Sequence, residues 1–162
     1  MINNILTKAK SETDNYNSLV ESRFLIPGFD YWFSNHKHVR SPFAKDIEPE
    51  VRKNTSIVFM EWIKGLESSE LEKTPDSEFA EIFENILFNE AMKLTDDDDQ
   101  RLTISYPFMP RVGDIVRHKE NGDGKIIERK VSVSESNRKM FEVTVSSDND
   151  STVWKTQFEI PV

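Results

Sequence analysis

The stretch VGDIVRHKENGDGKII, from Val112 to Ile127, decides the fold of the C-terminal part of the chain. It consists of two short runs with apolar, β-branched residues on either side of a turn containing Asn, Asp and Gly. Such a pattern is typical of a β-hairpin. Gly122 and Gly124 help the backbone to reverse, because glycine has no Cβ to forbid positive φ angles. We therefore predict two antiparallel strands joined by this turn.

Further strand signals continue to the C-terminus and are separated by turns rich in Asn, Asp and Ser. The predicted strands are Asp114–His118, Lys125–Ser134, Met140–Ser147, Thr152–Thr156 and Glu159–Val162. Five strands in so short a stretch are typical of a small barrel. We expect residues 106–162 to form a five-stranded, SH3/Tudor-like β-barrel.

Residues 1–105 mainly show the three- and four-residue spacing of helices. Long helices are expected from Pro49 to Leu66 and from Pro75 to Leu94, with a shorter one near Tyr16–Phe24. Pro27-Gly28 is expected to end that first helix, and residues 25–48 are expected to be irregular. The whole chain is thus predicted to be α+β, with an acidic helical region (1–105) followed by the barrel (106–162).

Two shorter features lie between the helices and the barrel. The run Asp96–Asp99 is expected to break the preceding helix, because acidic residues are unfavourable at the negative end of the helix dipole. Residues 102–106 alternate between apolar and polar types, which is the period of a strand.

The net charge of −8 is unevenly distributed. Residues 1–105 contain 12 Lys and Arg against 20 Asp and Glu, whereas residues 106–162 contain 9 of each kind. All the excess acid therefore belongs to the helical region. Because contacts to phosphates need positive charge, we expect weak or no binding of duplex DNA at physiological salt.

No pattern of a catalytic or metal centre is found. Cysteine is absent, which excludes disulfides, thiolate metal sites and a Cys nucleophile. His36 and His38 are expected to be surface loop residues, and Asp96–Asp99 lacks the Gly and Glu of a calcium loop. The turn Gly122–Lys125 lacks the first Gly and the Ser or Thr of a phosphate-binding loop. We predict a non-enzymatic protein without a metal or cofactor.

The N-terminal segment Met1–Lys10 has only four scattered apolar positions, too few for a signal sequence. No apolar run approaches the roughly 20 residues that a membrane-spanning helix needs. We expect a cytoplasmic protein that does not contact a membrane.

The stretch Val112–His118, the turn Gly122–Gly124 and the following Lys125-Ile126-Ile127 together resemble a known domain. They are similar to the C-terminal Tudor-like domain of bacterial superfamily-1 DNA helicases of the UvrD/PcrA type. The ending Trp154–Pro161 is similar to the last strand of such barrels, and RNA-polymerase-binding barrels of the CarD type share the pattern. The resemblance implies an SH3-like fold that docks on RNA polymerase. It covers about a third of the chain, and no helicase motif is present.

The predicted barrel has large aromatic residues that its core need not hold, and an open barrel leaves a strand edge for a partner. The residues proposed to contact a partner protein are Trp154, Phe141, Phe158, Arg117 and Arg129. We interpret the chain as a protein-interaction module whose barrel docks on a partner protein, with the transcription or DNA-maintenance machinery as the candidate source of that partner.

Three alternatives remain at this point. The first is a nucleic-acid-associated accessory factor that uses a basic cluster on the first two strands. The residues of this cluster are Arg111, Arg117, His118, Lys119, Lys125, Arg129 and Lys130. The second is an acidic inhibitor or immunity-type protein whose helical surface blocks a basic partner. The third is an enzyme with an unfamiliar site.

Overall fold

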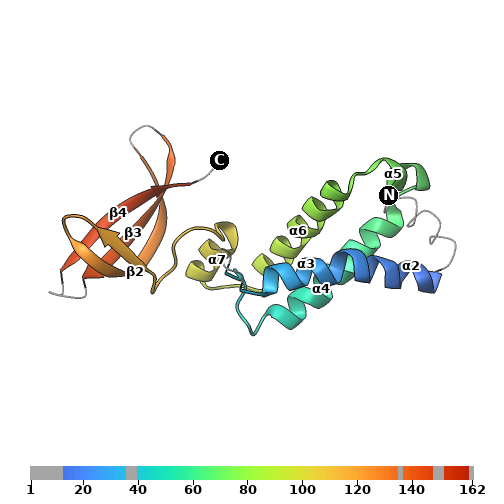
Figure 1. Ribbon diagram of the computed structural model, residues 1–162, viewed down its shortest axis with the longest axis horizontal. Helices are drawn as coiled ribbons and strands as arrows, with labels where there is room; N and C mark the ends of the chain where they lie inside the picture. Colours follow the sequence, from blue (N-terminus) through green and yellow to red (C-terminus); the bar gives the residue numbers. More distant parts are fainter. Residues whose placement is uncertain (1–12, 36–39, 135–136, 148–151, 161–162) are drawn as a thin grey trace. The chain divides into compact units, whose positions relative to one another are not determined.

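The computed structural model describes residues 13–35, 40–134, 137–147 and 152–160, with only the backbone described for residues 13–16. The chain divides into two compact units, Met1–Pro107 and Phe108–Val162, which we call the helical unit and the sheet unit (Figure 1). Helices and an antiparallel sheet are thus both present, in agreement with the predicted α+β class. The closed five-stranded barrel is not found.

The helical unit consists of short and long helices in succession. In chain order they are α2 (Thr13–Val20), the π-helical turn η1 (Glu21–Leu25), α3 (Ile26–Phe33), α4 (Glu48–Gly65), α5 (Ser68–Lys73), α6 (Asp76–Lys93) and α7 (Asp98–Ser105). The two long helices predicted from periodicity are confirmed as α4 and α6. The short helix α5 carries a capping box between Glu67 and Glu70 and was not predicted.

The prediction that Pro27-Gly28 ends the first helix is wrong, and the irregular conformation expected for residues 25–48 is found only after Phe33, in the described residues between α3 and α4. The helical path continues from η1 through α3 to Phe33. Pro27 lies in the first turn of α3, directly after the π-helical turn η1, and the backbone stays helical on both sides of it. A Cβ on Gly28 would clash with the ring of Phe83 on α6. Gly28 therefore allows close packing of two helices and does not stop one.

The strand prediction suggested by the alternation at residues 102–106 is also wrong. Residues 102–105 form the last turn of helix α7, and Tyr106 is the residue that follows the helix. The side chain of Asp97 accepts a hydrogen bond from the Gln100 N–H at 2.7 Å, and Asp98 and Asp99 occupy the first turn. Acidic residues are favourable at the positive end of a helix. The acidic run therefore begins a helix as well as following one.

A cluster of aromatic rings forms the core of the helical unit. The ring of Phe59 on α4 contacts those of Phe24, Trp62 and Phe83, with ring centroids 5.6–6.0 Å apart. The buried apolar residues of this core are Val20, Leu25, Phe29, Trp32, Phe33, Phe43, Val51, Phe59, Ile63, Leu71, Phe79, Phe83, Leu87, Ala91 and Ile104. The aromatic stretch Phe29–Phe33 thus supplies core residues from α3.

The sheet unit contains four antiparallel strands in the order β1-β2-β3-β4. They are β1 (Ile115–His118), β2 (Gly122–Val133), β3 (Lys139–Ser147) and β4 (Val153–Glu159). The prediction of separate strands at Thr152–Thr156 and Glu159–Val162 is wrong for the described residues, because one strand runs from Val153 to Glu159, and residues 161–162 lie outside them. The intervening Gln157 and Phe158 form no turn, so one strand runs through them.

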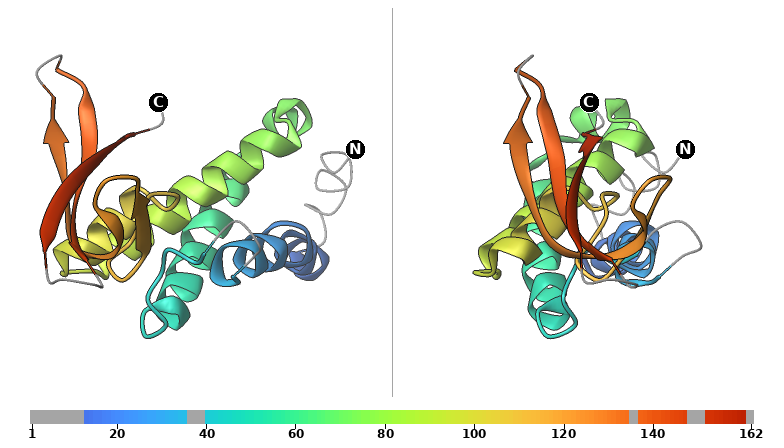
Figure 2. Two further views of the ribbon diagram at one scale, coloured as in Figure 1. Left: turned by 60° about the vertical axis from the view of Figure 1, so that its left-hand side comes forward. Right: turned by 90° about the vertical axis from the view of Figure 1, so that its left-hand side faces the viewer.

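The sheet curls into a half-barrel, as Figure 2 shows by the strong bend of the strands drawn in orange to red. A register shift between Ile126 and Glu128 marks a β-bulge, which increases the local twist. Gly124 allows close approach of β2 and β3, since a Cβ there would lie 2.7 Å from the Ser146 carbonyl oxygen. Gly122 has a φ of 74° and serves the turn, as predicted. The curl brings side chains of the two outer strands together, with the rings of His118 and Trp154 5.1 Å apart.

Candidate interaction surfaces

The curled sheet has two chemically different faces. Strand register places the side chains of Ile126, Val145 and Trp154 in one row on the inner face. The next rows on this face contain Arg129, Val143 and Thr156, and then Val131, Phe141 and Phe158. The outer face carries Lys130, Glu142 and Gln157 across the same three strands. The inner face is therefore largely apolar, and the outer face is charged.

Phe141 and Arg129, two of the predicted partner-binding residues, lie inside the protein. Phe141 is fully buried, and Arg129 is only 6% exposed. A guanidinium N–H of Arg129 donates to the Pro110 carbonyl oxygen at 2.9 Å, and the guanidinium carbon lies 5.9 Å from the centre of the Phe141 ring. Both side chains stabilise the sheet unit and do not form a surface.

Trp154 and Phe158 are half-buried on β4, an outer strand of the sheet. The Trp154 indole N–H is buried, and no acceptor for it is found among the described residues. His118, whose ring contacts Trp154, accepts hydrogen bonds at Nδ1 from the N–H groups of Glu120 and Asn121. His118 is thus held by its own turn. Of the predicted aromatic contacts, Trp154 and Phe158 are the ones that remain partly accessible.

Arg117 is fully accessible, with 87% of its side chain exposed, and its Nε lies 3.7 Å from Asp123. This long, solvated ion pair contributes little to stability. Of the five predicted site residues, the structure brings Arg129 together with Phe141, and it pairs Phe141 with Phe158 across β3 and β4. Arg117 and Trp154 do not belong to that group.

The outer edge of β4 is the most distinctive feature of the sheet unit. In the described part of the chain, β4 pairs with β3 on one side and with no strand on the other. The Ser147 N–H donates to the Thr152 carbonyl at 2.8 Å, which marks this pair as hydrogen-bonded. Antiparallel pairs alternate between bonded and non-bonded types.

This alternation assigns the main-chain groups of β4 to its two sides. Trp154, Thr156 and Phe158 direct their N–H and C=O groups toward β3. The groups of Val153, Lys155, Gln157 and Glu159 are directed away from the sheet. Such an edge is a template for pairing with another strand.

The opposite edge of the sheet, formed by β1, has fewer main-chain groups available for pairing. Strand β1 has only four residues, and the Ile126 N–H donates to the Asp114 carbonyl at 2.9 Å. By the same alternation, only Ile115 and Arg117 of β1 direct main-chain groups outward. The longer edge of β4 is therefore the better site for an added strand. Sequence reasoning predicted an open edge but did not identify Lys155, Gln157 and Glu159 as its residues.

A cluster of charges covers the outer face beside this edge. Glu142 lies 3.2 Å from Lys130 and 3.5 Å from Lys155, and it accepts a hydrogen bond from Gln157 at 3.3 Å. The hydrogen bond from Lys130, followed by that from Gln157, lowers the pKa of Glu142 below its ordinary value of 4.5. These contacts connect side chains of β2, β3 and β4 across the outer face.

Three residues of the basic cluster predicted as a nucleic-acid surface are buried or lie near an acidic side chain. Arg129 is buried, Lys130 pairs with Glu142 at 3.2 Å, and Arg117 lies near Asp123. Exposed Lys119 and Lys125 have no ion-pair partner among the described residues. Two isolated lysines do not form the extended basic stripe that phosphate binding requires.

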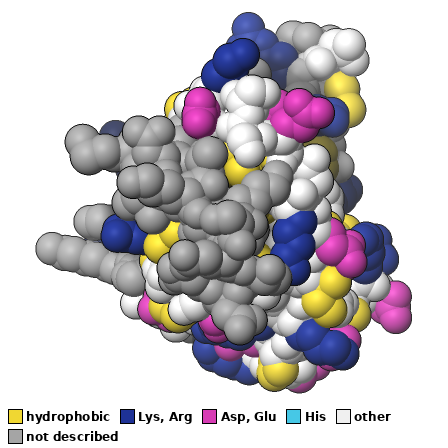
Figure 3. Space-filling model, turned by 90° about the vertical axis from the view of Figure 1, so that its right-hand side faces the viewer, with side chains coloured by type: hydrophobic (Ala, Val, Ile, Leu, Met, Phe, Trp, Pro, Cys, Tyr) yellow, Lys and Arg dark blue, Asp and Glu magenta, His cyan; other side chains and the backbone are white. Residues whose placement is uncertain are grey.

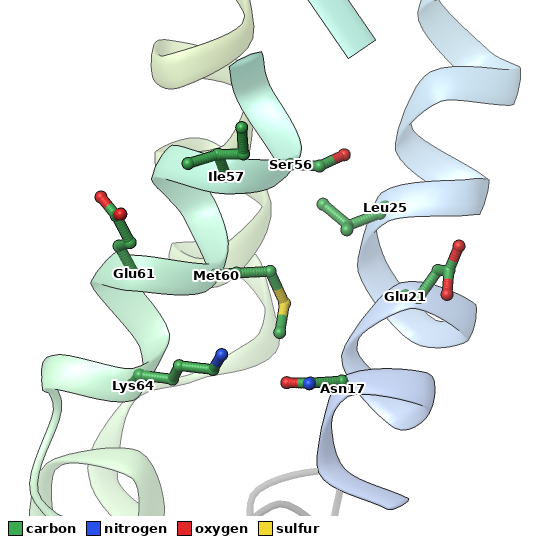
Figure 4. A pocket seen from close by; sticks show the side chains of 8 residues that line it. All are labelled: Asn17, Glu21, Leu25, Ser56, Ile57, Met60, Glu61 and Lys64. Carbon is green, nitrogen blue, oxygen red and sulfur yellow. The ribbon is translucent and has the colours of Figure 1, made fainter. Parts of the chain in front are cut away.

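The helical unit has a groove of about 450 Å³ between α2/η1 and α4. Figure 4 shows Leu25 and Met60 facing each other across it, with Asn17 and Lys64 at one end. Ile57, half exposed, and Glu61 point away from the groove in this view. Its rim combines both signs of charge, so charge does not select a partner for it.

The acid surplus of the chain forms no single patch on the face drawn in Figure 3. Basic and acidic side chains lie among each other in the coloured part of that view, with hydrophobic ones scattered between them. This arrangement gives the acidic-inhibitor alternative no particular surface there.

No cluster of three metal-ligating side chains occurs among the residues that the structure describes. His36 and His38 lie outside those residues. Within the same described ranges, no helix has the length and apolar character needed to cross a membrane.

Comparisons with known proteins complete the description of these surfaces. Neither a protein-family model, nor a curated protein, nor a solved structure matches the chain.

Proposed function

We propose that this protein is a non-enzymatic interaction module, and that the outer edge of β4 pairs with an extended strand of a partner protein. The observation that supports this proposal is the one-sided pairing of β4 over seven residues. Added strands gain affinity from main-chain hydrogen bonds and specificity from alternate side chains. In β4 these alternate side chains are Trp154 and Phe158 on one face and Lys155 and Gln157 on the other.

Purified bacterial RNA polymerase is the first partner to test, because Val112–Ile127 resembles barrels that dock on it. Hydrogen exchange of the full chain provides the readout. In the free protein, the amides of Lys155, Gln157 and Glu159 should exchange faster than those of Trp154, Thr156 and Phe158. A bound strand should slow the exchange of the Lys155, Gln157 and Glu159 amides.

Gln157→Pro removes one outward N–H and leaves the main-chain hydrogen bonds to β3 in place, while its side-chain hydrogen bond to Glu142 is lost in the alanine control as well. We expect it to weaken binding by about tenfold or more, since losing a main-chain hydrogen bond and adding a ring to the edge both oppose pairing. Gln157→Ala keeps the N–H and is the matched control, expected to bind within about threefold of the parent chain. Thermal unfolding checks that both variants fold.

Equal binding by the proline variant, with protection appearing on the helices and none on β4, would show that the edge is not the docking site.

A further inference from the structure

The sequence of β4 indicates which strand fits its edge. Around Gln157 the segment reads Lys155-Thr156-Gln157-Phe158-Glu159, with opposite charges at equal distances from the centre. Resting on the proposed function, we propose that the partner strand is β4 of a second copy of this chain. The two strands pair antiparallel about a two-fold axis at Gln157.

The charges support this register. A two-fold axis at Gln157 places Lys155 of each copy directly opposite Glu159 of the other, so the contact is made twice. Both residues direct their main-chain groups outward, so these pairs coincide with hydrogen-bonded positions. Opposite charges placed directly across two strands stabilise pairing, and like charges destabilise it.

Other antiparallel registers lack this match. A shift of the axis to Thr156 places Lys155 opposite Gln157 and leaves Glu159 opposite Val153. An axis at Lys155 places Lys155 opposite Lys155 of the second copy, and an axis at Glu159 places Glu159 opposite Glu159. Both pairs of like charges are unfavourable. Gln157 is therefore the centre that the charges select.

The present partners of these side chains leave them available. Lys155 Nζ lies 3.5 Å from Glu142, and Glu159 lies 3.7 Å from Arg138. Both contacts are long, and the Lys155 and Glu159 side chains are 59% and 78% exposed, so the contacts are weak. Each charge can thus turn to a second copy at little cost.

The inner face adds apolar contact in the same register. Thr156 lies opposite Phe158 of the second copy, at a non-hydrogen-bonded pair where side chains approach most closely. Phe158 is only half-buried within one chain. The contact between β1 and β4 occurs at Trp154, before the segment Lys155–Glu159 begins. Pairing would therefore cover apolar surface that one copy leaves exposed.

Analytical ultracentrifugation of the full chain tests the proposal, over concentrations of roughly 1 µM to 1 mM, where weak association is measurable. We expect a concentration-dependent dimer of the parent protein. Lys155→Glu and Glu159→Lys each place like charges opposite each other, so each should weaken the dimer by about tenfold or more. The double variant with both reversals should restore dimerisation to within about threefold.

Lys130→Glu is the matched control. Lys130 also contacts Glu142 on the outer face but belongs to β2, away from the edge. It should leave the dimer unchanged, which separates pairing at the edge from a general change of surface charge. Circular dichroism checks the fold of each variant.

A parent protein that stays monomeric throughout would overturn the proposal, as would single reversals without effect or a double variant that is not restored. The proposed strand-docking function fails separately. It would stand if a monomeric chain showed β4 protection with RNA polymerase. It would fail if neither RNA polymerase nor a second copy of the chain slowed exchange along β4.

Discussion

The helical unit and the sheet unit satisfy their main-chain polar groups differently. Each helix closes its hydrogen bonds within its own segment, so the helical unit needs neighbours mainly to cover its apolar faces. A strand needs another strand on each side, and β4 has one on a single side in the described chain. The unpaired main-chain edge of β4, and not exposed apolar surface, is therefore the feature of the sheet unit that supports the proposed binding of a partner.

The largest expected effect comes from removing one buried ring from each unit. Phe59→Ala and Phe141→Ala delete side chains that are fully buried, and each should cost about 3–5 kcal/mol. The helical unit should remain folded, because its aromatic core is extensive. The sheet unit should unfold, since a domain of its size has little stability to lose. Amide resonances assigned to each unit would report this difference.

Phe108→Ala is the control for these two variants. Its side chain is 66% exposed, so its removal should change stability by less than about 0.5 kcal/mol. Loss of both units in one transition, in either core variant, would contradict the expectation that they unfold separately.

A smaller effect should follow from adding one methyl group between α3 and α6. Gly28→Ala drives a Cβ into the Phe83 ring and should destabilise the helical unit by about 1–3 kcal/mol. Gly65→Ala, at the end of α4, meets no atom within 4 Å and should be neutral or stabilising by up to about 1 kcal/mol. Urea unfolding of both variants measures the contrast. Equal midpoints would mean that α3 can shift without cost.

The N-terminal cap of α7 should contribute less to stability than the packing at Gly28. Asp97→Ala removes the acceptor for the Gln100 N–H and should cost about 1 kcal/mol. Asp96→Ala removes a neighbouring charge that does not cap the helix and should cost less than half as much, about 0.5 kcal/mol or below. Thermal unfolding compares the two, and equal losses would assign the effect to charge alone.

The smallest effect concerns the outer face of the sheet. Because the folded-state pKa of Glu142 is lowered, its charge stabilises the sheet unit above about pH 4.5. That contribution is lost as the pH falls through the lower, folded pKa. Glu142→Gln should therefore be less stable than the parent chain at neutral pH, with the difference disappearing in acid.

An NMR titration of the Glu142 carboxyl group provides the direct measurement. A midpoint below 4.5 is expected, and Lys130→Met should move it upward, because Lys130 is the main cause of the shift. A midpoint at or above 4.5 in the parent chain would show that the lysine contacts do not persist in solution.

Local sequence patterns were sufficient to predict helices with a regular apolar face and a hairpin with a glycine-containing turn. The period of apolar residues predicted α4 and α6, and the turn chemistry around Gly122 predicted the hairpin of β1 and β2. The composition also located the excess acid in the first 105 residues. These features depend on neighbours in sequence, so the sequence alone determines them.

Tertiary contact decided the features that local signals left ambiguous or misread. Gly28 lies within α3, where its missing side chain leaves room for Phe83 of α6, and residues 102–105 are helical although they alternate like a strand. For the candidate site, the sequence indicated Trp154 and Phe158 but also Phe141 and Arg129, which the curl of the sheet buries. Alternation along a strand defines two faces, and only long-range pairing determines which face is covered and which edge stays open.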